Sequence, residues 1–118
     1  GNQLIDELRA RLHEKAYNTA ILYYHMESYL SAYTSFKNAT IDFPDIPEKE
    51  KVDYYVVKSA YLYAKKSVKT LQITRFETAI EEADEYLQNY TDNKYVKEVK
   101  EMRSESTDRI QSLKTTLN

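Results

Sequence analysis

Two histidines are the residues whose chemistry comes closest to a catalytic or metal site. His13 and Glu14 begin like the zinc-binding motif HExxH, but position 17 is Tyr, so the second histidine ligand is missing. His25 falls at the end of a predicted helix, where an imidazole can cap the last carbonyls or face the helix dipole. No nucleophile and base stand together in the sequence as a catalytic pair would require. We therefore predict that the chain binds no metal or cofactor and is not an enzyme.

Two clusters of like charge could instead attract a partner of opposite charge. One is acidic and lies within residues 81–85, and the other is basic and lies within residues 65–69. Charge runs of this length on helices are usually solvated faces, and we favour that interpretation for both. The basic cluster could also form a rim beside a binding surface. Its members are Lys65, Lys66 and Lys69, and the acidic ones are Glu81, Glu82, Asp84 and Glu85.

The composition excludes several classes of protein. The 118 residues include one Gly, two Pro, no Cys and no Trp, but 12 Tyr. Without internal glycines there is no phosphate-binding loop or nucleophile elbow, and without cysteines there is no zinc ribbon or disulfide scaffold. A net charge of −2 argues against nucleic acid as a partner, and no apolar run is long enough to span a membrane. We expect one globular domain over residues 1–118, with Gly1 as a cleavage scar of a longer protein.

Apolar residues recur at helical spacing along almost the whole chain, and the breakers divide it into five predicted helices. We place these at residues 4–25, 30–43, 48–68, 74–90 and 94–117. Ser28 and Asp92 or Asn93 are candidate N-caps, and Thr74 with Glu77 forms a capping box. The apolar face of the first helix consists of Leu4, Leu8, Leu12, Ala16, Ala20 and Tyr23. The fold class is therefore all-α.

The sequence contains a weak internal repeat. Residues 16–23 align with residues 56–63 at an offset of 40, and Ala32 then aligns with Ala79 at an offset of 47. The change of offset predicts a seven-residue insertion near residues 67–73.

The repeated positions resemble the tetratricopeptide repeat (TPR), a pair of antiparallel helices with small residues where the helices touch. In the first repeat, residues 13–46, the matching residues are Ala20, Tyr23, Ala32, Phe36, Ala39 and Pro44. The second repeat, residues 53–93, keeps Ala60, Tyr63 and Ala79. The resemblance implies a right-handed superhelix of antiparallel helix pairs, with residues 94–117 as a capping helix.

More closely, the chain resembles the C-terminal TPR region of the BamD-like lipoproteins, which belong to the outer-membrane β-barrel assembly machine. The Bacteroides-type members are the most similar. The resemblance rests on residues 14–17, 22–24, 29–36, 42–45, 75–82 and 89–95. It implies a scaffold at the periplasmic face of the outer membrane, lipid-anchored through a missing N-terminal region. The implied partner is the POTRA region of a BamA-like barrel subunit, and we expect the chain alone to be a monomer.

The resemblance also implies where a partner would bind. In a TPR the first helix of each pair lines a concave groove, and 12 tyrosines are more than two repeats need for packing. The groove and its rim would consist of Tyr17, Ile21, Tyr24, His25, Tyr61, Lys65 and Lys66. Two alternatives remain open: the aromatic residues could instead pack as core, and the chain could be a generic TPR adaptor that captures a peptide or protein in this groove.

Overall fold

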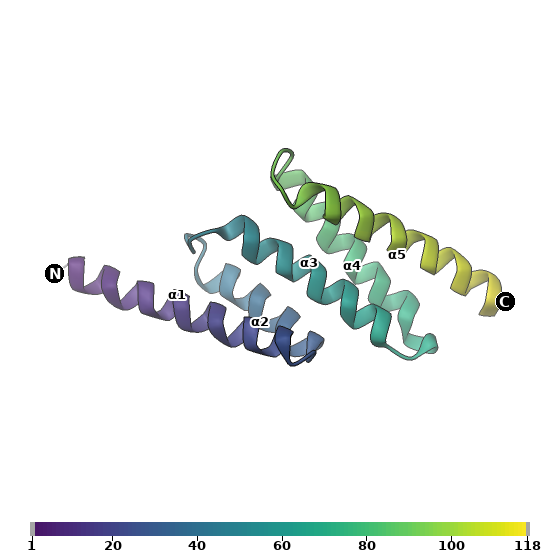
Figure 1. The fold of residues 1–118 in the computed structure, drawn as a ribbon, viewed down its shortest axis with the longest axis horizontal. Coiled ribbons are helices and arrows are strands. Elements are labelled where there is room, and N and C mark those ends of the chain that lie inside the picture. Colours follow the sequence, from purple (N-terminus) through teal and green to yellow (C-terminus); the bar gives the residue numbers. More distant parts are fainter. Residues whose placement is uncertain (1, 118) are drawn as a thin grey trace.

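The computed structural model describes residues 2–117, so that Gly1 and Asn118 lie outside the described residues. This part of the chain forms five α-helices and no strand, which confirms the predicted all-α class (Figure 1). The molecule measures 62 × 29 × 18 Å. The helices are α1 (Asn2–His25), α2 (Tyr29–Asp42), α3 (Lys49–Lys66), α4 (Lys69–Asn89) and α5 (Val96–Leu117).

The helices lie in two layers, with α1, α3 and α5 in front and α2 and α4 behind (Figure 1). Each helix packs against the next one along the chain, and α3 also contacts α5. The two ends of the chain lie at opposite ends of the molecule. As a result α3 has neighbours on both sides, whereas α1 packs mainly on α2.

The turns between the helices are short, and their backbone conformation and hydrogen bonds differ from one turn to the next. Glu27 and Glu48 adopt left-handed backbone conformations just before α2 and α3, with φ of 60° and 52°. Ser28 stands at the predicted N-cap of α2, but its side chain makes no capping hydrogen bond. Before α5, the Asn93 side chain accepts a hydrogen bond from the Tyr95 backbone N–H at 2.9 Å, but α5 begins at Val96, so Asn93 lies in the turn before the helix and not at its N-cap.

The predicted start of the fourth helix was wrong. Because α4 begins at Lys69, Thr74 and Glu77 lie inside the helix and cannot form a capping box at its start. The side chain of Gln72, in the first turn of α4, instead donates to the carbonyls of Ala64 and Lys65 at the end of α3. Residues 69–73 therefore belong to a helix and not to an inserted loop.

The extra seven residues lie at the end of α4, not near residues 67–73. The starts of α2 and α4, Tyr29 and Lys69, are 40 residues apart, whereas their ends, Asp42 and Asn89, are 47 apart. Buried residues follow the offset of 40, since Phe36 and Phe76 are both 0% exposed. Pro44 follows the end of α2, but the residue 40 positions later is Asp84, so nothing stops α4 there.

The residues that the repeat resemblance assigns to helix packing are mostly buried. Six of them have at most 2% of their surface exposed: Ala20, Ala32, Phe36, Ala39, Ala60 and Ala79. Tyr23 is 36% exposed and Tyr63 is half-buried, so they pack less closely than expected. Pro44 is exposed in the turn after α2.

The structure buries only part of the apolar face predicted for the first helix, namely Ala20 and, in part, Ala16. Only His13 and Ala20 of α1 are buried. Leu4, Leu8 and Leu12 are 69%, 58% and 45% exposed. The periodicity correctly placed these leucines on one side of a helix, but no described part of the chain covers that side.

Candidate protein-binding surface

Three of the predicted groove residues come together on α1. Tyr17, Ile21 and Tyr24 are half-buried and pack against the core cluster formed by the end of α1, α2 and the start of α3. The Tyr17 ring lies edge-on to Phe36 with centroids 6.1 Å apart, and the Tyr24 ring lies 5.0 Å from Tyr55. These side chains therefore combine packing with partial exposure.

The other predicted site residues lie elsewhere. Tyr61 belongs to the second core cluster, is 6% exposed, and donates a hydrogen bond to Glu105 of α5. Lys65 and Lys66 are exposed at the end of α3, and His25 is exposed at the end of α1. Lys66 forms an ion pair with Glu27 at 2.5 Å. The structure thus does not gather the seven predicted residues on one open surface.

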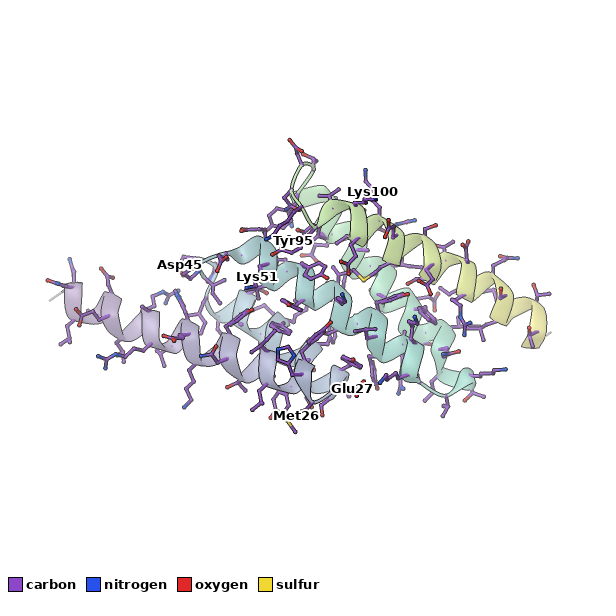
Figure 2. All side chains as sticks on the ribbon, in the orientation of Figure 1. Met26, Glu27, Asp45, Lys51, Tyr95 and Lys100 are labelled. Atoms are coloured by element: carbon purple, nitrogen blue, oxygen red, sulfur yellow. The ribbon has the colours of Figure 1, made fainter. Side chains whose placement is uncertain are left out.

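A chain of aromatic contacts runs from α1 across α3 to the turn before α5, and the sequence analysis did not identify it. Tyr55 stacks on Phe36 at 5.2 Å and meets Tyr54 at 5.1 Å, and Tyr54 stacks on Tyr95 at 4.5 Å. Figure 2 shows Tyr95 beside α3. Adjacent tyrosines early in the third predicted helix were the available signal, but the repeat assigned no role to them.

The excess of tyrosine has a structural use. Three tyrosines each donate a hydroxyl hydrogen bond to a glutamate of a neighbouring helix, and a lysine one turn later contacts the same glutamate. We call these arrangements Tyr-Lys clamps. Their members are Tyr33, Lys37 and Glu82; Tyr54, Lys58 and Glu98; and Tyr61, Lys65 and Glu105. The signal in the sequence was Tyr followed by Lys four residues later on a helix.

The clamps change the electrostatics of their members. Burial, and then the hydrogen bond to the glutamate, raises the pKa of Tyr33 and of Tyr61 above the ordinary value.

The interpretation of the acidic cluster as a solvated face was wrong for Glu82, which is 6% exposed and lies in a clamp. Asp84 also pairs with Arg103 of α5, whereas Glu81 and Glu85 are exposed.

A cavity of about 300 Å³ opens between α1 and the start of α3. His13 forms part of its wall and lies edge-on to Phe43, with ring centroids 4.6 Å apart. The His13 Nε2 atom is 3.7 Å from Asp45 and has no hydrogen-bond partner among the described residues. The lining comprises Ala10, His13, Glu14, Tyr17, Ile46, Pro47, Glu48, Lys51 and Val52.

The largest set of exposed apolar side chains lies along the outer side of α1. We call it the α1 apolar face, and it consists of Leu4, Ile5, Leu8, Leu12, Leu22 and Met26, which are 45–69% exposed. Met26, just after the helix, points away from the body of the molecule (Figure 2). Along 5, 8, 12, 15, 19, 22 and 26 the spacing alternates between three and four residues, with polar Lys15 and Thr19 in the middle. That spacing suits contact with another helix.

The described residues contain no cluster of three or more His, Cys, Asp or Glu side chains that could hold a metal ion. Over residues 2–117, none of the helices combines the length and the apolar character needed to cross a membrane.

No model of a known protein family matches the chain, and no curated protein matches it either.

Proposed function

We propose that this protein is a TPR-like helical-repeat scaffold that binds a partner protein through helix packing. Two features support the repeat: the antiparallel helices follow one another in two layers, and the buried positions recur 40 residues apart. Ala20 with Ala60, Phe36 with Phe76 and Ala39 with Ala79 are all at most 2% exposed. Stacked helix pairs of this kind offer long surfaces to other proteins.

The observation on which the proposal rests is the α1 apolar face. Two of its positions have a more covered counterpart on α3, 40 residues later: Leu12 is 45% exposed whereas Val52 is 1% exposed, and Leu22 is exposed whereas Leu62 is half-buried. Val52 and Val56 belong to the core cluster that contains Ala32, Phe36 and Ala39 of α2. We infer that a helix of the partner packs on α1 in the way that α2 packs on α3. Burial of several leucines would drive this association.

The more specific proposal is a BamD-like scaffold of the outer-membrane assembly machine. The sequence resemblance supports it, with the periplasmic face of the outer membrane as location and a lipid anchor outside this chain. The partner would then be the POTRA region of the cognate barrel subunit. In this form the protein acts by holding its partner and not by catalysis.

A generic peptide-capturing adaptor is the second candidate. The observation that favours it is the cavity of about 300 Å³ beside the half-buried Tyr17, which a side chain of a bound peptide could enter. On this alternative the partner need not belong to an outer-membrane machine.

Binding calorimetry with the cognate POTRA region tests the proposal. A variant with both Leu8→Glu and Leu12→Glu should keep the melting temperature of the wild type, because both side chains are exposed, yet lose at least about tenfold in affinity. Ile41→Glu is the matched control, since Ile41 is 64% exposed on α2, and it should bind like the wild type. Equal binding by all three proteins would contradict the α1 face, and no binding by the wild type would contradict the specific partner.

A further inference from the structure

Lysine ammonium groups lie over tyrosine rings at several places in this protein, and an acid usually joins them. Lys58 lies 5.6 Å from the ring centroid of Tyr54, and Lys65 lies 5.3 Å from that of Tyr61. In both cases a glutamate of α5 completes the arrangement as a Tyr-Lys clamp. The two glutamates, Glu98 and Glu105, are seven residues apart on α5, as Tyr54 and Tyr61 are on α3.

The Lys51 ammonium of α3 lies over the Tyr17 ring of α1 at a similar distance, although the two residues belong to different helices. The Lys51 ammonium is 5.5 Å from the Tyr17 ring centroid. Among the residues that the structure describes, Lys51 forms no ion pair with a carboxylate, although Lys49, Lys58, Lys65 and Lys66 do. Lys94 over Tyr95 also lacks an acid, but these two are sequence neighbours in the turn before α5, and the Lys94 side chain is exposed.

Lys51 and Tyr17 differ from Lys94 and Tyr95 because both line the cavity between α1 and α3. The rest of the lining is mixed: Ala10, Ile46, Pro47 and Val52 are apolar, and His13, Glu14 and Glu48 are polar. A volume of about 300 Å³ has room for an acidic side chain together with its methylene groups and a neighbouring apolar residue. The Tyr17 hydroxyl also raises the pKa of Lys51, which keeps the ammonium charged.

From this geometry we propose that the cavity receives a glutamate side chain from a helix of the bound protein, with Tyr17 and Lys51 forming its clamp. The proposal rests on the proposed function and names a chemical feature of the partner. Glutamate on a helix is the expected source, because the acids of all three internal clamps, Glu82, Glu98 and Glu105, are helical glutamates. A charge-assisted hydrogen bond from the ammonium and one from the hydroxyl would hold the carboxylate.

Two glutamates of the chain itself, Glu14 and Glu48, also line the cavity and oppose an entering acid. Both are exposed, so water and salt screen their repulsion, whereas the hydrogen bonds of the clamp act at contact distance. This arrangement predicts that Glu14→Gln strengthens binding of an acidic helix, in contrast to the loss expected from changes at Lys51 or Tyr17.

The test uses a phage-displayed library of helical peptides selected on the full chain. Counter-selection on the Lys51→Met variant, which keeps the aliphatic stem but removes the charge, retains the peptides that need Lys51. We expect these peptides to share a glutamate at one position. Replacing that glutamate by glutamine should weaken binding to the wild type by about tenfold or more and leave binding to Lys51→Met nearly unchanged. With Tyr17→Phe, which keeps the ammonium, the same replacement should weaken binding by a smaller factor. Melting curves of both variants would verify that they fold.

Retained peptides without a shared acid, or a library in which no peptide distinguishes Lys51→Met from the wild type, would overturn the inference. Peptides that bind Lys51→Met as tightly as the wild type but bind the Leu8→Glu, Leu12→Glu variant more weakly would overturn the inference about the cavity. They would leave the proposed function intact. The failure of the proposed function itself would show in the calorimetry with the POTRA region, which does not depend on the library.

Discussion

Tyrosine hydroxyls form hydrogen bonds between helices of this protein. These bonds fix the relative position of the helices more specifically than apolar contacts alone would. Tyr54 is 7% exposed, yet its hydroxyl reaches the Glu98 carboxylate at 2.7 Å and lies 3.0 Å from Lys58. A hydroxyl that donates to a buried or half-buried carboxylate fixes both the separation and the register of two helices. The high tyrosine content is thus in part a property of the packing.

Replacing Tyr54 by Phe should lower the free energy of unfolding by about 0.5 to 1.5 kcal/mol, because Glu98 loses one hydrogen bond while Lys58 remains. Chemical denaturation of the two proteins measures the difference. Tyr23→Phe is the matched control, since Tyr23 is 36% exposed and its hydroxyl has no partner among the described residues. A Tyr54→Phe variant as stable as the control would show that the clamp adds no stability.

Alkaline pH should weaken the fold. Burial is the leading cause that raises the pKa of Tyr33, Tyr54, Tyr61 and Tyr90 above the ordinary value of 10.0. The folded state therefore favours the neutral phenol, and this contribution is complete below pH 10 and is lost as pH rises towards the folded pKa values. Tyrosinate absorbance followed together with helicity should show late, cooperative ionisation above pH 10. Ionisation of all 12 tyrosines near pH 10 with unchanged helicity would contradict the burial of these four hydroxyls.

At the scale of the elements, small residues determine how closely the helices approach. Ala20 and Ala32 are fully buried where α1 meets α2. Ala20→Leu or Ala32→Leu should overpack this contact and cost about 1 to 3 kcal/mol of stability. Thermal melting measures the effect, with Ala10→Leu at an exposed position of α1 as the control. An unchanged melting temperature in both buried variants would mean that the contact can readily open.

The sequence predicted the number and class of these elements, because prolines and polar turns interrupt a clear helical period. It did not predict the start of α4, since Val68 precedes that helix without a side-chain cap while Thr74 and Glu77 imitate a cap further along. The alignment then placed seven extra residues before α4. The physical cause of the longer helix lies at the other end, where Asp84 takes the place that Pro44 has in the first repeat.

At the scale of the whole molecule, burial is uneven along the chain. The middle helix α3 buries eight residues between its neighbours, whereas α1 buries two. Sequence periodicity could group Leu4, Leu8 and Leu12 on one side but could not show which side a neighbour covers, because the cover depends on tertiary packing. The Tyr-Lys clamps were missed for the same reason, since each one needs an acid from a distant helix.

Hydrogen exchange, measured on the chain alone and with the cognate POTRA region, tests most directly the claim that α1 is the surface for the partner. In the free chain, residues 2–12 should exchange fastest among the helices, because nearly all of their side chains are exposed, and α3 should exchange slowest. We predict that the partner slows exchange in residues 2–12 and leaves the outer side of α5 unchanged. Protection confined to α4 and α5, with no change in α1, would contradict the account.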